Sequence, residues 1–257
     1  MGGTAGAAPW PETVSRRIHL VLVLIGLVVI WEALFLYAGE EALRGPAETL
    51  RDTAGLLTTD LFWTHFGETV RAFAMALTLA VCGGITLGMW LGFHRLSSEL
   101  FVPMLIGFAS IPKVVLYPLV LLAFGLGLPA KVAFGAMFGI PPIALSTIGA
   151  VANIRPVLVK LGRVLGLNAA SMTRIVLVPA VLPEIMTGLR LGFSVTLIGT
   201  ILGEMFAARR GLGYLLMTAI GLHDVTLIMS LAFVLTALAV CASAVLLAID
   251  RRLRQRF

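Results

Sequence analysis

Runs of apolar residues dominate the chain, and each of them is long enough to cross a lipid bilayer as one helix. A bilayer core needs about 20 such residues per helical span. Six spans explain the pattern most economically, at about residues 18–38, 70–93, 101–126, 130–151, 184–207 and 225–249. The pattern predicts an all-α, polytopic membrane protein whose transmembrane domain covers residues 18–250.

The composition agrees with a membrane protein and excludes most other classes. Hydrophobic residues make up 59% of the 257 residues, charged residues make up 12%, and the mean hydropathy is +1.02. Soluble domains carry about 25% charged residues and about 45–50% apolar ones. A soluble enzyme, a disordered regulator and a disulfide scaffold are therefore excluded. Cys82 and Cys241 lie inside apolar runs, and no His or Cys spacing indicates a metal site.

The net charge of +6 is distributed unevenly along the chain. Lys and Arg gather in the cytoplasmic loops of membrane proteins. With six spans, both termini share one side, and eleven basic residues fall on that side: Arg16, Arg17, Arg95, Arg155, Lys160, Arg163, Arg174, Arg251, Arg252, Arg254 and Arg256. Five basic residues fall on the other side: Arg44, Arg51, Lys131, Arg209 and Arg210. The charge predicts cytoplasmic tails at residues 1–17 and 251–257, and it does not indicate nucleic-acid binding. The Arg209–Arg210 pair is an exception on the outside.

The first apolar run follows Arg16 and Arg17, as the core of a signal peptide would. It is longer than the roughly 7–15 apolar residues of a signal peptide. We therefore expect a retained membrane helix.

Few polar groups lie deep in the predicted spans, and no series of acidic or His side chains indicates a proton relay. Lys113 follows Pro112 in the third span, so it either lines a pathway or snorkels toward the membrane surface. Tyr117 shares that helix and is the second pathway candidate. Pro112 and Pro118 predict a kink in the third span, and the Pro141–Pro142 pair predicts one in the fourth.

A polar, basic stretch between the fourth and fifth spans predicts a helical hairpin at about residues 156–180. Its first part has amphipathic helical spacing, and Gly166 ends that helix. A second short helix can start near Asn168 or Ala169, and Pro179 and Pro183 are expected to separate it from the fifth span. The hairpin is either a docking element for a partner protein or an amphipathic helix on the membrane surface.

Several segments together resemble the permease subunits of ABC importers. Three parts of this chain resemble the cytoplasmic signature of that family: Gly166, Asn168-Ala-Ala-Ser and the stretch Ile175–Pro183. Four further segments resemble the branch of the family that is associated with sulfonates, taurine, nitrate and pyrimidine precursors. They are Ile111-Pro-Lys, Phe124-Gly-Leu-Gly127, Thr187-Gly-Leu-Arg190, and Gly203-Glu-Met205 with Gly211-Leu-Gly-Tyr-Leu215. The resemblance extends over about residues 45–250. One departure is that Lys160, Leu161 and Gly162 stand where the family has Glu-Ala-Ala, so the usual acid is replaced by a base.

The resemblance implies the type I ABC-importer permease fold in a bacterial inner membrane, in contact with lipid. Two permease copies, as a homodimer, would form the path for a small anion or a pyrimidine-like heterocycle, which an extracytoplasmic binding protein delivers. Two ATPase subunits would carry the ATP and Mg. The sequence agrees with this division, because no Gly-x-x-x-x-Gly-Lys phosphate loop occurs in it. The chain is therefore expected to be a transport subunit without a cofactor, a metal or an enzymatic activity of its own.

The resemblance also assigns roles to individual residues. Contact with the ATPase would involve Arg163, Gly166, Asn168, Ala169, Leu182 and Pro183. An outer gate would involve Glu204, Met205, Gly211, Gly213 and Tyr214, beside the pathway candidates Lys113 and Tyr117.

Two other classes of function remain as alternatives. A stand-alone, ion-coupled carrier or channel would transport without ATP. An intramembrane enzyme could use Ser194 as a nucleophile, although the sequence offers no convincing Ser–His pair across two spans.

Overall fold

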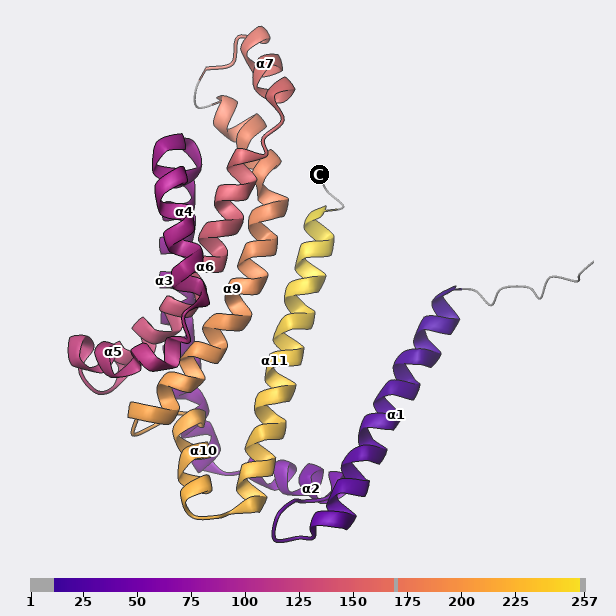
Figure 1. Cartoon of the computed structure of the whole chain (residues 1–257). Coiled ribbons are helices and arrows are strands. Elements are labelled where there is room, and N and C mark those ends of the chain that lie inside the picture. Colours follow the sequence, from indigo (N-terminus) through magenta and orange to yellow (C-terminus); the bar gives the residue numbers. More distant parts are fainter. Residues whose placement is uncertain (1–11, 169–170, 255–257) are drawn as a thin grey trace, which may run out of the picture.

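A computed structural model describes residues 12–168 and 171–254, and every regular element in these ranges is helical (Figure 1). The elements are α1 (Glu12–Ala38), α2 (Pro46–Leu56), α3 (Asp60–Phe93), α4 (Arg95–Ser110), η1 (Lys113–Leu116), α5 (Tyr117–Phe124), α6 (Leu128–Ala152), α7 (Pro156–Val164), η2 (Met172–Leu177), α9 (Val178–Ala207), α10 (Leu212–Gly221) and α11 (Val225–Arg254). Five of the described helices are long and apolar enough to span a membrane, and a bent pair raises that number to six. The all-α, polytopic prediction is confirmed.

The long helices run between two ends of the molecule (Figure 1). One end carries α7, and the end of α11 lies toward it, whereas the start of α1 lies to one side at about mid-height. The opposite end carries the short helices α2 and α10. We call these the hairpin end and the α10 end. The grouping of both chain tails with the hairpin stays a prediction, because much of the tails lies outside the described residues.

Helices α3, α6 and α9 form the centre of the bundle, and small residues let them approach closely. Side chains added at Gly84 and Gly88 of α3 would collide with Ile143 and Thr147 of α6. Gly139 of α6 is confined in the same way, because a side chain there would collide with Ala80 of α3 and Thr196 of α9. Such positions let membrane helices gain van der Waals contact, which replaces the hydrophobic driving force that lipid does not supply.

The third predicted span differs from a simple kinked helix. Helix α4 ends at Ser110, and the next helical segment, η1 followed by α5, turns away by 92°. Ile111 is extended (φ −65°, ψ 134°), as a residue before proline prefers, and Pro112 has no N–H with which to continue the helix. Pro118 does not kink a helix as predicted. It lies in the first turn of α5, where a missing N–H costs nothing.

The prolines of the fifth span were expected to separate it from the hairpin, and there the prediction is wrong. The kink predicted at Pro141 and Pro142 in the fourth span stays a prediction. Helix α6 continues through Pro141 and Pro142. The second helix of the hairpin is not separated from the fifth span, because η2 runs directly into α9 through Pro179 and Pro183. The π-helical turn η2 widens the hydrogen-bond pattern just before Pro179, and Val178 N–H donates to Thr173 O, five residues back. Such a turn absorbs the register change that a proline imposes.

Helix α1 leans away from the central bundle and lies beside α11 only near the α10 end (Figure 1). An apolar groove of about 650 Å³ separates the two helices, and Leu27, Trp31 and Phe233 are among its lining residues. Trp31 Nε1 donates to the Arg44 carbonyl, and the Arg44 guanidinium donates to Thr226 Oγ1 at the start of α11. These bonds attach one end of α1 and leave most of its apolar surface exposed.

Candidate functional site

A buried polar cluster at the end of α9 contains the acidic residue predicted for the outer gate. The Glu204 side chain is fully buried, and its Oε1 lies 3.4 Å from Lys131 Nζ at the start of α6. Its Oε2 accepts hydrogen bonds from Thr69 Oγ1 of α3 at 2.8 Å and from Gly213 N at 3.1 Å. A buried carboxylate needs such partners, because an unpaired charge away from water is costly. The cluster therefore joins α3, α6, α9 and the start of α10.

Residues 208–213 connect α9 to α10 and include the first two residues of α10, and we call this segment the strap. Its backbone is held to the cluster by hydrogen bonds. Lys131 Nζ donates to the Arg210 carbonyl at 3.0 Å, and Leu212 N–H donates to Thr69 Oγ1 at 2.8 Å. His65 Nδ1 lies 3.0 Å from Gly211 N and 3.1 Å from Gly211 O, so it accepts from the N–H or donates to the carbonyl according to its tautomer. The protein thus satisfies the polar groups of the strap with side chains from α3, α6 and α9.

Gly211 is required by the geometry of the strap. Its φ of +128° lies in a region that favours glycine, and a Cβ there would collide with the Glu204 carboxylate. Gly213 is equally confined, because a Cβ there would meet Ile201 O and the side chain of Glu204. The Gly-Leu-Gly sequence therefore fits the strap closely against the buried acid.

The structure brings together most of the residues predicted for the outer gate. Glu204, Gly211 and Gly213 are in direct contact, and the Tyr214 ring stacks on His65 with centroids 5.8 Å apart. Met205 follows Glu204 and is half-buried at the edge of the cluster. Whether these residues act as a gate stays a prediction, since the contacts show only how they are held.

The two pathway candidates pack against neighbouring aromatic rings of α6, and neither contacts the Glu204 side chain. Tyr117 is buried, its ring packs edge-on against Phe134, and its hydroxyl donates to Gly203 O at 2.7 Å. Lys113 is half-buried, and its Nζ donates to Ala109 O and lies 5.2 Å from the centre of the Phe138 ring. These contacts are typical of side chains that stabilise the bend after α4. Their roles in a pathway stay predictions.

Three members of the cluster were not among the predicted site residues: Lys131, Thr69 and His65. Lys131 counts in the sequence as a cation of an outer loop, but it lies in the first turn of α6 and is only 3% exposed. Thr69 and His65 sit four residues apart on one face of α3. This spacing places both side chains on the same side of α3, but it does not by itself indicate a site. Their role becomes visible only because Glu204, 135 residues after Thr69, lies in the same cluster.

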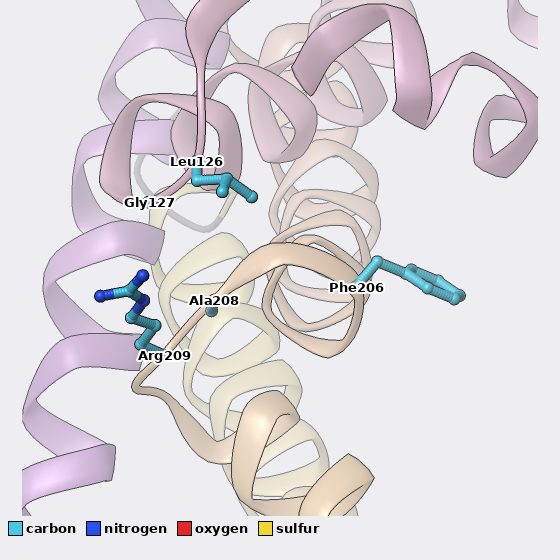
Figure 2. A pocket seen from close by; sticks show the side chains of 5 residues that line it. All are labelled: Leu126, Gly127, Phe206, Ala208 and Arg209. Carbon is cyan, nitrogen blue, oxygen red and sulfur yellow. The ribbon is translucent and has the colours of Figure 1, made fainter. Parts of the chain in front are cut away.

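A pocket of about 580 Å³ opens beside the strap and is lined by Leu126, Gly127, Phe206, Ala208 and Arg209 (Figure 2). Figure 2 shows Arg209 and Phe206 pointing away from each other on the two sides of the chain that leaves α9. The Arg209 guanidinium is exposed, and so is the Phe206 ring. The pocket is therefore an open surface hollow with one cation on its rim.

The predicted hairpin lies at the opposite end of the molecule, and part of its local geometry follows the prediction. Gly166 ends the turn after α7 with a φ of +66°, and no atom lies within 4 Å of a Cβ built there. Asn168 Oδ1 accepts from Ser171 N–H at 2.8 Å, which is the expected N-cap. Arg163 is exposed on α7, and Leu182 and Pro183 are half-buried on α9. Ala169 lies outside the described residues.

The apolar side of the hairpin is uncovered. Leu161, Val164 and Leu165 are 54%, 84% and 66% exposed, although they form the apolar face of an amphipathic helix. Clustered apolar exposure beside basic residues is typical of an interaction site. The second arm continues into α9, so a force on the hairpin reaches the helix that carries Glu204.

Neither end of the molecule has the composition of a metal centre. Within residues 12–168 and 171–254, no group of three or more His, Cys, Asp or Glu side chains could hold a metal ion.

Ser194 Oγ donates to Arg190 O of its own helix, as serines in membrane helices commonly do.

Comparison with known proteins identifies the family. The family described as binding-protein-dependent transport system inner membrane component matches residues 84–257. The riboflavin transport system permease protein of Chloroflexus aurantiacus is 32% identical over 223 residues, covering 85% of this chain and 81% of the relative. The taurine transport system permease protein of Escherichia coli is 27% identical, covering 82% of this chain and 79% of the relative. The formylaminopyrimidine transport permease protein of Halalkalibacterium halodurans is 28% identical, covering 77% and 80%.

Solved structures show the same fold. An inward-facing MetNI methionine ABC transporter gives a TM-score of 0.63 at 19% identity, covering 76% of this chain and 99% of that chain. An amino acid ABC transporter gives a TM-score of 0.58 at 19% identity, covering 79% and 97%. The predicted type I importer permease fold is therefore confirmed. The chain belongs to the family of binding-protein-dependent transport system inner membrane components and is a multi-pass permease subunit of an ABC importer.

Proposed function

We propose that this permease subunit forms the path for a small solute that an extracytoplasmic binding protein delivers and that ATP hydrolysis on a separate chain drives. The hairpin is the observation that best supports this function, because its apolar face is exposed and its second arm is continuous with α9. Closure of an ATPase against α7 would tilt α9 and, at its far end, the buried cluster around Glu204. The translocation path would thereby alternate between a state open to the cytoplasm and a state open to the outside.

The contact with the ATPase is assigned to the hairpin residues Arg163, Gly166, Asn168 and Ala169, with Leu182 and Pro183 joining the hairpin to the bundle. Lys160 replaces the acid that related hairpins carry, so the complementary group on this ATPase is expected to be acidic at that point. ATP and Mg would bind to the ATPase, and this chain would hold no cofactor.

The orientation follows from charge. The basic residues concentrate at the hairpin end, which we place in the cytoplasm together with both termini. The α10 end would then face the binding protein. Single cysteines introduced at Val164 and at Leu222, both largely exposed, would test this with a membrane-impermeant maleimide applied to intact cells. Labelling at position 222 and protection at position 164 are expected, and the reverse pattern would overturn the orientation.

The exposed apolar surface of α1 and its groove with α11 support a homodimer in which a second copy covers this surface. Membrane lipid would cover what the second copy leaves exposed. Mass measurement of the complex in nanodiscs would separate two permease copies from one.

The solute is proposed to be a small anion such as a sulfonate or nitrate, or a pyrimidine-like heterocycle, because relatives are named for taurine, nitrate and formylaminopyrimidine transport. The binding protein would select among them.

The proposal is tested by co-expression of the tagged chain with the ATPase and binding protein encoded beside it. Co-purification of the ATPase, and solute uptake into proteoliposomes that requires ATP, are expected. Uptake by the purified chain alone without ATP would instead indicate a stand-alone carrier or channel.

A further inference from the structure

We infer that Arg209 and Arg210 of the strap form a preorganised docking contact for acidic side chains on the extracytoplasmic binding protein. The inference rests on the proposed function, because it assumes that the α10 end faces that protein. It adds the residues and the chemistry by which the two proteins recognise each other.

The charges of both arginines are available. Arg209 and Arg210 are exposed, and no acidic side chain within residues 12–168 and 171–254 forms a salt bridge with either. Arg44 and Arg95, in contrast, each pair with a glutamate one helical turn away. The nearby carboxylate of Glu204 is buried beneath the strap and already bound to Lys131, Thr69 and Gly213.

Hydrogen bonds hold the backbone from Arg210 to Gly213. The Arg210 carbonyl is bound by Lys131, and the next three residues are bound by His65, Thr69 and Glu204. A contact on a rigid segment loses little conformational entropy when a partner binds. The buried cluster thus anchors the backbone at Arg210, next to Arg209.

The position of the pair is unusual for a membrane protein. Most other basic residues outside the spans are predicted to lie on the hairpin side, whereas these two lie between α9 and α10. Positive charge on the outer side works against the usual insertion bias. An adjacent pair there is therefore more typical of a functional surface than of a topological signal.

The chemistry fits a protein carboxylate better than a solute in transit. Guanidinium groups bind carboxylates with two parallel hydrogen bonds. Arg209 lies on the rim of an open hollow whose other side chains, Leu126 and Phe206, are apolar. The exposed Arg209 guanidinium is accessible to an acidic side chain carried on a protein surface. Charges at such a rim mainly accelerate association and make it sensitive to salt.

The test measures binding of the binding protein to the permease–ATPase complex in phosphatidylcholine nanodiscs, with wild type, Arg209→Glu/Arg210→Glu and Arg51→Glu. Arg51 is a matched control, because it is an exposed arginine on α2 at the same end of the molecule. We expect the double variant to lower the association rate constant about tenfold at low salt, with the difference fading as salt screens the charges. Arg51→Glu should leave the rate within twofold of wild type. Unchanged ATPase co-purification would show that the double variant is folded.

Three results would overturn the inference. Equal association rates for wild type and the double variant would remove the docking role. Unchanged association with slower solute uptake would assign the pair to the solute path. A defect that appears only in nanodiscs with anionic lipid would assign it to lipid headgroups. The proposed function fails separately, if the wild-type complex itself neither binds the binding protein nor takes up solute.

Discussion

The Glu204 carboxylate occupies the space that a side chain on Gly211 would need, so the acid of α9 and the glycine of the strap fit only as a pair. Gly211 also has a φ of +128°, which other residues adopt only under strain.

Gly211→Ala should destabilise the protein strongly, because it adds both backbone strain and a collision with a buried carboxylate. A loss of about 2–4 kcal/mol in the free energy of unfolding is expected. Gly127→Ala is the matched control, since Gly127 also has a positive φ (+110°) but no atom within 4 Å of its Cβ position. Equilibrium unfolding in detergent micelles measures both variants. Equal losses for the two would show that the contact with Glu204 does not matter.

Lys131→Met should cost about 3 kcal/mol or more, because it leaves Glu204 buried without its counter-charge. Adding Glu204→Gln removes that charge, so the double variant should be more stable than the sum of the two single losses predicts. A double-mutant cycle from the same unfolding measurements gives the coupling free energy, expected to be at least about 1 kcal/mol. Additive losses would contradict a direct interaction between the two side chains.

The close contact of α3 with α6 should not tolerate added volume. Gly88→Ala places a methyl group against Thr147 and the Ala144 carbonyl, with an expected cost of about 1–3 kcal/mol. Gly107→Ala on α4 has nothing within 4 Å of the new atom and is expected to be neutral or slightly stabilising. The thermal unfolding midpoints of the two variants give the comparison, and a stable Gly88→Ala protein would mean that the helices pack less closely than described.

The turn of the hairpin should set the coupling between ATP hydrolysis and transport. Gly166 has a φ of +66°, so Gly166→Val is expected to distort the turn, whereas Gly166→Asn should be tolerated because asparagine adopts this conformation more readily. The measurement is the number of ATP molecules hydrolysed per solute transported in proteoliposomes. We expect the ratio to rise several-fold for valine only. A valine variant with wild-type coupling would exclude the turn from the mechanism.

The helical membrane fold was predictable because lipid imposes a long apolar run on each spanning helix. Breaks at proline were less predictable, since a proline acts through its neighbours. Pro112 ends a helix because Ile111 is free to extend, Pro118 begins one, and Pro179 is accommodated by the π-helical turn before it. Sequence spacing alone does not distinguish these cases.

The candidate site was predictable in its glycines and its acid but not in its cation. Gly211, Gly213 and Glu204 are close in sequence, so they fall within one segment of the resemblance to the permease family. Lys131 and Thr69 reach Glu204 from other helices, across 73 and 135 residues. Their partnership depends on how α3, α6 and α9 pack, which the order of residues along each helix does not specify.

We expect this chain to transport its solute only as part of an ATP-driven assembly. The most direct measurement is uptake of the solute retained by the neighbouring binding protein into proteoliposomes that hold the permease, with the ATPase, the binding protein or ATP omitted in turn. Uptake that requires all three, and that stops when ATP is replaced by a non-hydrolysable analogue, is the predicted result. Uptake at an undiminished rate by the permease alone would contradict the account.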